Sequence, residues 1–239
     1  GVSISNARIF IGSGARLDAD ATSTTFGTVA LPASDDPRAV GFSVDGVSLD
    51  LGIFTARDSS PDGVAYTALE TYRKYTGLEG AVGRGQLQGV DAVKIIGKEL
   101  VLKLNQTTVS GGAVLDWRQA PVTGVLVALG PTDPKFRIGG SVGLSIADLV
   151  YGSATISVSR TLVTGVTVTE TSGVSTLKGD LFAIAISQAK LFIGSGASLD
   201  TNSSSTGFGS VTLPASNDAQ AVGFSVSAGA LDLGVFTAR

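Results

Sequence analysis

The stretch of sequence that decides the fold occurs twice. Its first copy runs from ARIFIGSG at residues 7–14 to FTAR at residues 54–57, and its second from AKLFIGSG at residues 189–196 to FTAR at residues 236–239. The copies align without a gap at an offset of 182 residues, and 33 of the 51 paired positions are identical. Self-similarity at a fixed period is typical of repeat arrays.

We interpret residues 1–182 as one full period and residues 183–239 as the start of the next, equivalent to residues 1–57. The pattern stops inside a period, so we expect the sequence to be a window on a longer array. A shorter motif recurs within the period. Apolar and polar residues alternate, the alternation slips by one residue at a small, Asx or Gln residue, and it resumes until a glycine. Alternation predicts half-buried strands, and the slip predicts a bulge or a tight turn. The six instances are marked by Ile4, Val44, Val93, Ile146, Ile186 and Val226.

The intervals between these markers are 40, 49, 53, 40 and 40, and the first four add up to the period of 182. One period therefore holds four β units of about 40–53 residues. A single unit cannot bury its apolar face, so we expect the units to stack into one elongated body. Two geometries fit: a β-solenoid-like rod, which we slightly prefer, and a long extended antiparallel sheet. The Asp45-Gly46 pair favours a hairpin, although its counterpart Ser227-Ala228 lacks that signal.

The composition agrees with an all-β chain that has few or no helices. Hydrophobic residues make up 43% of the chain and charged residues 15%, which is enough apolar surface for a core and excludes the disordered class. Glycine is abundant, at 32 residues, and aromatic residues are sparse, at 6%. Plentiful Val, Ile, Thr and Ser suit strands and tight turns better than helices.

Charge and hydropathy exclude several classes of partner. The net charge is −3 and no run of basic residues occurs, which disfavours nucleic-acid binding. No apolar stretch approaches the roughly 20 residues that a membrane-spanning helix needs. The chain has no Cys, Met or His. A disulfide framework, a thiol nucleophile and a catalytic histidine are therefore excluded, although missing cysteine fixes no compartment.

The best candidate site is a possible calcium turn at Asp58, Ser60 and Asp62. Together with Gly63 these residues match the opening of a calcium loop, with oxygen ligands at positions 1, 3 and 5 and glycine at position 6. Position 12, which should be an acid, is Leu69. A solvated turn explains the same residues, because Asp, Ser, Pro and Gly all favour turns. Calcium here would rigidify a connection rather than catalyse a reaction.

Other candidates are weakened by comparing the two copies. The acidic pairs Asp18/Asp20 and Asp35-Asp36 each lose one acid in the second copy, so we interpret them as solvated loops. Ser187 and Lys190 fit a Ser-x-x-Lys pattern, but the equivalent of that lysine is Arg8, which cannot act as a base. The glycine-rich stretch at residues 83–89 lacks the end of a phosphate-binding loop. We expect no enzyme activity.

Trp117 allows two interpretations. An exposed tryptophan can stack on sugar rings or mark an interface, whereas a lone tryptophan in a β protein more often packs over the core. We favour the second. Trp117 also ends the segment GAVLDW at residues 112–117, which together with GSVGLSIAD at residues 140–148 resembles tandem β-repeat modules of giant bacterial surface and adhesin-like proteins. This resemblance implies an exported structural or adhesive stalk and carries over no catalytic residue.

The sequence therefore predicts a structural segment of a repetitive extracellular bacterial protein, located outside the cell or on its surface. We expect it to form a rod, stalk or filament with a mechanical or adhesive role, in contact with neighbouring repeats or identical chains in a fibre. One alternative is a carbohydrate- or lipid-binding β module: a continuous apolar lane without a cover would favour lipid, and exposed Tyr and Trp would favour a surface glycan. A polysaccharide-active enzyme on a β-helix is a weaker alternative.

Overall fold

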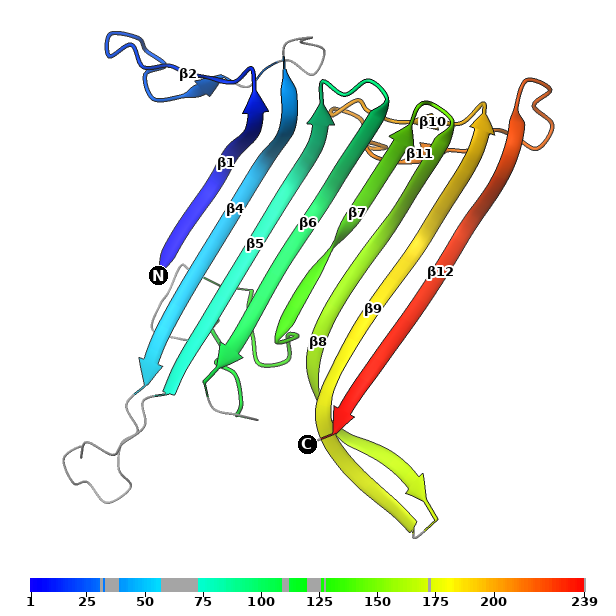
Figure 1. The fold of residues 1–239 in the computed structure, drawn as a ribbon. Coiled ribbons are helices and arrows are strands. Elements are labelled where there is room, and N and C mark those ends of the chain that lie inside the picture. The colour runs from blue at the N-terminus through cyan, green and yellow to red at the C-terminus, as the bar shows by residue number, and fades with distance from the viewer. Residues whose placement is uncertain are drawn as a thin grey trace.

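The chain forms one large open sheet of eight antiparallel strands (Figure 1). A computed structural model describes residues 1–30, 32, 39–56, 73–108, 112–119, 126, 128–171 and 173–238. None of these residues lies in a helix, so the all-β prediction is confirmed for them. The strands are β1 (Val2–Ser13), β2 (Arg16–Leu17), β3 (Val29–Ala30), β4 (Val40–Ala56), β5 (Arg73–Gln88), β6 (Val93–Thr107), β7 (Phe136–Ile146), β8 (Val150–Glu170), β9 (Gly173–Ser195), β10 (Ser198–Leu199), β11 (Val211–Thr212) and β12 (Val222–Ala238).

The large sheet has the order β1-β4-β5-β6-β7-β8-β9-β12, so each long strand pairs with the next long strand along the chain. The short strands form two separate pairs, β2 with β3 and β10 with β11. All pairings are antiparallel. The solenoid geometry that the sequence slightly favoured is therefore not what the described residues show. The second geometry, a long antiparallel sheet, matches them.

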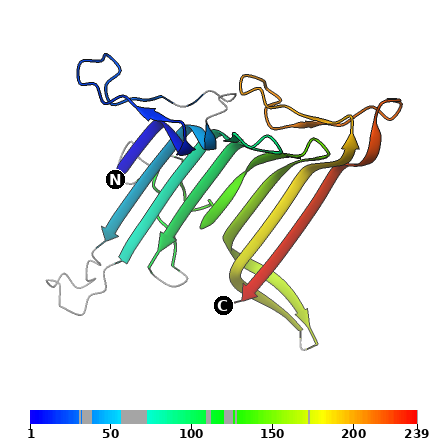
Figure 2. The same cartoon turned by 45° about the horizontal axis from the view of Figure 1, so that its top comes forward.

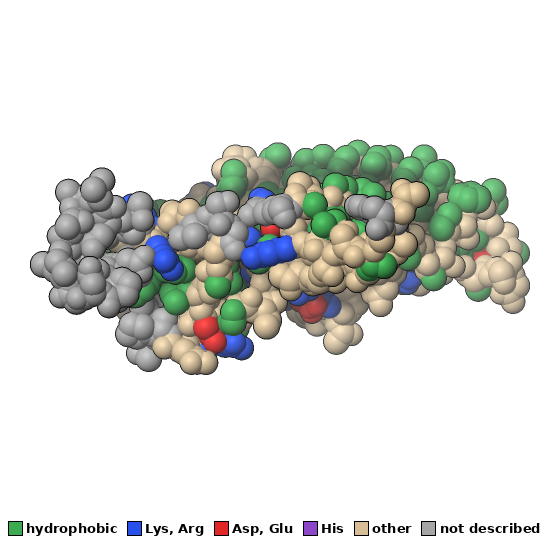
Figure 3. Space-filling model, turned by 90° about the horizontal axis from the view of Figure 1, so that it is seen from below, with side chains coloured by type: hydrophobic (Ala, Val, Ile, Leu, Met, Phe, Trp, Pro, Cys, Tyr) green, Lys and Arg blue, Asp and Glu red, His purple; other side chains and the backbone are tan. Residues whose placement is uncertain are grey.

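Alternation of side chains gives the sheet one apolar and one polar face, because residues paired across strands share a face. One paired row crosses all eight strands and is almost entirely aliphatic: Ile4, Leu49, Gly80, Leu102, Ile138, Val158, Ile184 and Leu233. The adjacent row, on the opposite face, contains Ser3, Asp50, Glu79, Lys103, Arg137, Ser159, Ala183 and Gly234. Figure 3, a view from below, shows hydrophobic side chains gathered along one side of the molecule.

Several of the predicted slips in alternation are bulges. Register shifts occur beside Asn6, Gln188 and Ala228, each of which has a positive φ between 50° and 56°. A bulge inserts one extra residue and so returns the apolar side chains to the same face. The slip at Asp148 is instead the tight turn between β7 and β8, where Ile146 pairs with Val150.

The hairpin predicted at Asp45-Gly46 is wrong. Both residues lie inside the 17-residue strand β4, which stays paired with β5 on either side of them. Gly46 has a φ of 67°, a conformation that glycine adopts without strain. The same two residues that favour a hairpin turn therefore make a bulge, because β1 and β5 pair with β4 along its length.

Among the described residues, buried hydrophobic side chains gather in two small clusters on the polar face. One contains Trp117, Leu126 and Leu129, and the other contains Tyr151, Phe192, Ala197 and Val211. Trp117 is 2% exposed, so the prediction that it packs over a core is confirmed. Its ring lies over β4 and β5 at two glycines, Gly52 and Gly77, where side chains would collide with it.

The molecule exposes far more surface than a compact protein of its mass. Its solvent-accessible area is 14749 Å² for 24.0 kDa, whereas a compact monomer of that mass exposes about 9,900 Å². The cause is the single layer, since large side chains of the apolar face such as Ile53, Ile138 and Leu233 are about half exposed. This surface is unusual for an isolated soluble domain, which rarely exposes a contiguous apolar patch larger than a few hundred Å².

The contact between Trp117 and the glycines gives a first prediction. A Cβ atom at Gly77 would lie 2.6 Å from Leu126 Cδ1 and from Trp117 Cε2. We expect Gly77→Ala to lower the free energy of unfolding by about 1–3 kcal/mol, because overpacking forces the ring and the backbone apart. Urea denaturation measures this loss.

Gly152→Ala, on β8, is the matched control. The nearest atom to its new Cβ would be the carbonyl oxygen of Lys190 at 3.8 Å, an ordinary contact. The free energy of unfolding should change by less than about 1 kcal/mol. Equal losses for the two variants would show that Trp117 does not pack on β5.

Candidate functional site

The described loop residues 112–119 and 128–133 lie on the polar face and are held there by Asn105 of β6. This side chain is fully buried. Its Nδ2 donates hydrogen bonds to the carbonyl oxygens of Leu115 at 3.0 Å and Gly130 at 3.1 Å, and its Oδ1 accepts one from Trp117 Nε1 at 3.1 Å. Three bonds satisfy a polar side chain that would be costly to bury without partners. Asn105 therefore sets the position of the tryptophan.

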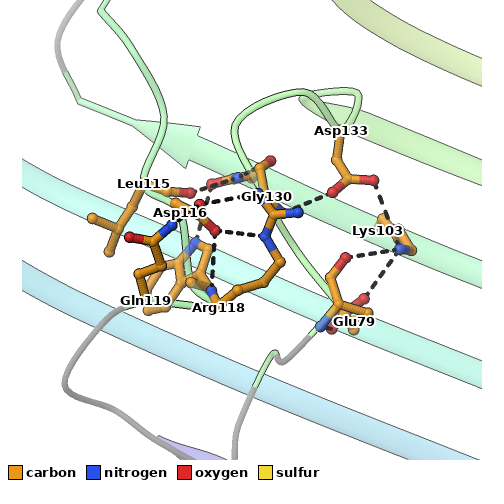
Figure 4. A network of polar contacts seen from close by, with 11 residues as sticks. Glu79, Lys103, Leu115, Asp116, Arg118, Gln119, Gly130 and Asp133 are labelled. Carbon is orange, nitrogen blue, oxygen red and sulfur yellow. Dashed lines mark hydrogen bonds and ion pairs between the residues drawn. The ribbon is translucent and has the colours of Figure 1, made fainter.

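Ion pairs hold the same loop from its outer side (Figure 4). Lys103 Nζ lies 3.2 Å from Glu79 Oε1 and 3.8 Å from Asp133 Oδ1, so the sheet and the loop share one cation. Asp133 Oδ2 also accepts a hydrogen bond from the backbone N–H of Gly130 at 2.7 Å. These contacts bind the two carboxylates to the scaffold, and the arrangement stabilises the loop rather than presenting a free acid and base.

Asp116 and Arg118 form a second pair at the rim of the loop. The guanidinium donates to both carboxylate oxygens, at 2.7 Å and 3.0 Å. Its hydrogen bonds hold the pKa of Asp116 below the ordinary value, and the same contact raises the pKa of Arg118. Both groups therefore stay charged, which suits a fixed pair and not a proton donor.

The β10–β11 segment docks on the polar face of the sheet. We call residues 197–212 the second flap. Figures 1 and 2 show it passing across the ends of β7 and β8. Phe208 is 3% exposed and Val211 is 1% exposed. Gly209 lies so close to β6 that an added Cβ would be 2.9 Å from Ile96 Cγ2. The second flap is thus a real packing layer over β6, β7 and β8.

Three cations on the sheet fix the second flap through its backbone. Lys98 Nζ donates to the carbonyl oxygen of Thr206 at 2.9 Å, and Lys190 Nζ donates to that of Val211 at 3.0 Å. Arg84 donates to the carbonyl oxygen of Ser203. A hollow of about 540 Å³ between the flap and the sheet is lined by both lysines, Ser141 and Thr155, among others. Both ammonium groups already donate hydrogen bonds to carbonyl oxygens of the flap. We therefore interpret the hollow as part of the surface on which the flap packs.

The equivalent segment of the first copy, residues 15–30, does not pack on the sheet in this way. We call it the first flap, and Figures 1 and 2 show it projecting beyond the β1 side of the sheet. Phe26, the counterpart of Phe208, is 58% exposed, and Val29, the counterpart of Val211, is 45% exposed. The two flaps nevertheless share their internal hydrogen bonds. In both copies the first aspartate of the turn accepts from the serine five residues later, at 2.7 Å from Ser23 and 2.6 Å from Ser205. The first flap is therefore folded without being covered.

Asp18 closes the first flap instead of holding a cation. Hydrogen bonds from Ser23, then from Thr25, then from the backbone N–H of Asp20 lower its pKa. Asp20 in turn accepts from Thr22. The described residues contain no group of three acids that could hold a metal ion. The predicted calcium residues Asp58, Ser60 and Asp62 lie outside the described residues, and so do Asp35-Asp36.

The structure places the remaining sequence candidates in strands. Ser187 pairs with Thr155 inside the sheet, and the lysine of that motif binds the second flap. Residues 83–88 of the glycine-rich stretch form the end of β5, and Gly89 follows it as a bend. Sequence analysis missed Asn105 and the flap anchor Phe208. Both copies keep a Phe-Gly pair at that anchor, and this shared pair is the sequence signal that could have identified Phe208.

Comparison with known proteins adds no relative. No protein-family model matches the chain, and neither a curated protein nor a solved structure matches it. Within the residues described by the structure, no helix is long and apolar enough to cross a membrane. The function must therefore be argued from the repeat and from the surfaces described above.

The turn at Asp18 gives a pH prediction. Its lowered pKa means that the ionised carboxylate stabilises the first flap, and this stabilisation is complete above the ordinary value of 3.8. It is lost as the pH falls through the lowered pKa of the folded state. We expect the Asp18 carboxyl carbon, followed by NMR, to titrate with a midpoint below 3.8. In Asp18→Asn the shifts of the Ser23 and Thr25 amides should no longer follow that titration. A midpoint at or above 3.8 would contradict the hydrogen-bonded turn.

Proposed function

We propose that the chain is a structural segment of a repetitive extracellular bacterial protein that forms a rod, stalk or filament. The observation that carries this proposal is that the two copies of the repeat stand at opposite edges of one sheet with the same pairing. In the first copy Ile9 pairs with Val44 and Ile4 with Leu49. In the second, the equivalent pairs are Leu191 with Val226 and Ile186 with Leu231.

The spacing of the copies supports growth in one direction. Six long strands, β1 and β4 to β8, separate the start of one copy from the start of the next. At about 4.8 Å per strand, one period of this kind advances the sheet by about 29 Å. Every added period would repeat that step, which is what a spacer or filament needs. The bacterial and extracellular setting and the adhesive role rest on the resemblance to surface-protein modules.

A structural role also fits the use of charged residues. Within the described part of the chain, Glu79, Asp116 and Asp133 fasten a loop, and Asp18 closes a turn. Acids that are bound in this way are not available as a catalytic pair. We therefore propose that the segment has no enzyme activity and that its partners are neighbouring repeats or identical chains.

Chains of one, two and three periods test the proposal. We expect negative-stain electron micrographs to show particles that lengthen by about 29 Å for each added 182-residue period, at constant width. Compact particles, or beads with the spacing of separate globular domains, would contradict a continuous sheet.

A second candidate function is supported by the apolar face. The aliphatic row described above crosses all eight strands, and none of its residues is buried. A surface of this kind could hold acyl chains of lipids. A sugar-binding face is supported less well, since Trp117 and Tyr151 are both buried.

Lipid extraction and mass spectrometry of the purified chain test this candidate. We expect co-purified lipid, and a loss of that lipid in Ile138→Lys, because Ile138 is on the apolar face and 47% exposed. Ser159→Lys places the same charge on the polar face and should leave the lipid in place. A parent chain free of lipid would rule the candidate out.

A further inference from the structure

We propose that two copies of this chain pack face to face through the apolar face of the sheet, so that the two sheets form one two-layered dimer. The contact deepens the proposed structural function, on which it rests, because it names the surface through which identical chains meet. No strand has to join an edge of the sheet.

The apolar face is uncovered at the centre of the sheet. On β7, Ile138 is 47% exposed, Val142 37% and Ile146 41%. These positions are four residues apart, so the period of two places their side chains on one face. Strand β7 has a paired strand on each side, β6 and β8, and the exposure therefore does not depend on where the sheet ends. Figure 3 shows hydrophobic side chains along one side of the molecule.

The centre of this face carries no charge. The residues of β7 on the apolar face, from Ile138 to Ile146, pair with Val158, Ile156, Ala154, Gly152 and Val150 of β8. Arg160 follows on the same face beyond these pairs, and its guanidinium donates to Asp180 Oδ2 at 2.7 Å. An unpaired charge is costly to bury, and charged residues are depleted at the centre of protein interfaces. A contact over β7 and β8 would bury no unpaired charge.

The size of the face matches what a stable dimer buries. The eight strands, spaced by about 4.8 Å, span about 34 Å. The 11 residues of β7 span about 36 Å. Each copy therefore offers about 1,200 Å², and two copies would bury about 2,400 Å². Obligate homodimers bury about 2,000–5,000 Å². The area exposed in excess of a compact monomer, about 4,800 Å², is large enough to supply this interface.

The face also has hollows that a large side chain can enter. Gly80 of β5 lies between two leucines, because Leu102 Cβ and Leu49 Cδ1 would lie 3.6 Å and 3.7 Å from an added Cβ. Gly152 of β8 lies in the same way between its paired residues Leu144 and Leu191. Sheets that pack face to face lie about 10 Å apart, and their side chains interdigitate. A copy of this face supplies the Leu and Ile side chains that would fill such hollows.

These features favour a second copy over lipid. A second copy offers a face of equal size that equally lacks charge at its centre. Acyl chains on an open single layer would stay in contact with water, whereas sites for small apolar ligands are concave and bury most of the ligand. Because the same surface is used by both copies, the contact is isologous and closes at two. It adds a layer and leaves the step of about 29 Å per period unchanged.

Sedimentation equilibrium of the intact chain, with lipid in the same sample measured by mass spectrometry, tests the contact. We expect lipid-free protein at twice 24.0 kDa. In Ile138→Lys the dimer would have to bury an ammonium group, so its dissociation constant should rise at least about hundredfold. Val142→Lys should act in the same way. Ser159→Lys, on the polar face, is the matched control and should leave the constant unchanged within about threefold.

Hydroxyl-radical footprinting of the parent chain checks the same face without any substitution that could prevent folding. The reporters are Ile138, on the apolar face, and Leu17, which is 64% exposed on the first flap. Between dilute and concentrated protein we expect oxidation of Ile138 to fall at least about threefold, because side chains at the centre of an interface lose contact with water. Oxidation of Leu17 should not change.

Several results would overturn the proposal. One is a parent chain that sediments at 24.0 kDa at every concentration, with or without bound lipid. Others are a dimer that both lysine variants of the apolar face leave intact, equal weakening by Ser159→Lys, and a dimer that does not protect Ile138. If tandem periods lengthen as expected while the chain stays monomeric, the structural function stands and this interface fails. A face-to-face dimer whose tandem periods form compact particles would mean the reverse.

Discussion

Backbone pairing between the long strands is the interaction on which the rest of the structure depends. The sheet is a single layer, and the two clusters of buried side chains on its polar face are small. The antiparallel ladders therefore carry most of the order, and the loop residues 112–119 and 128–133 and the second flap pack against them. This construction explains the large exposed area. It also explains why the edges matter, since a layer without a second sheet can gain stability only by adding strands or by covering its apolar face.

Much of the fold follows from local patterns in the sequence. Alternation predicted strands, and the slips at Asn6, Asp148 and Ala228 mark bulges or a turn. Comparing the two copies demoted Ser187 as a catalytic candidate, and the structure places it, like its counterpart Ser5, inside a long strand. The failure at Asp45-Gly46 has a physical cause: a turn signal is a local preference, and pairing on both sides of β4 overrides it.

The candidate surfaces were harder to predict. Asn105 is an ordinary polar residue in the sequence, and only the folded loop brings Trp117 and Gly130 to its side chain. The two flaps share 8 of their 16 residues, including the Phe-Gly pair, yet Phe26 is exposed and Phe208 is buried. That difference depends on which strands lie beside each copy, which no local pattern contains. The repeat predicted equivalence, and the structure shows where the two copies differ in their surroundings.

We infer that the two copies occupy equivalent steps of one sheet and have different neighbouring strands. Residue-resolved amide hydrogen exchange tests it directly, because residues 49–52 and 231–234 have the same sequence in the two contexts. The account predicts protection of all these amides on β4, which has a strand on each side. On β12 it predicts protection of only those that face β9, with fast exchange of those that face away. Equal protection of the two segments in the monomeric chain would contradict it.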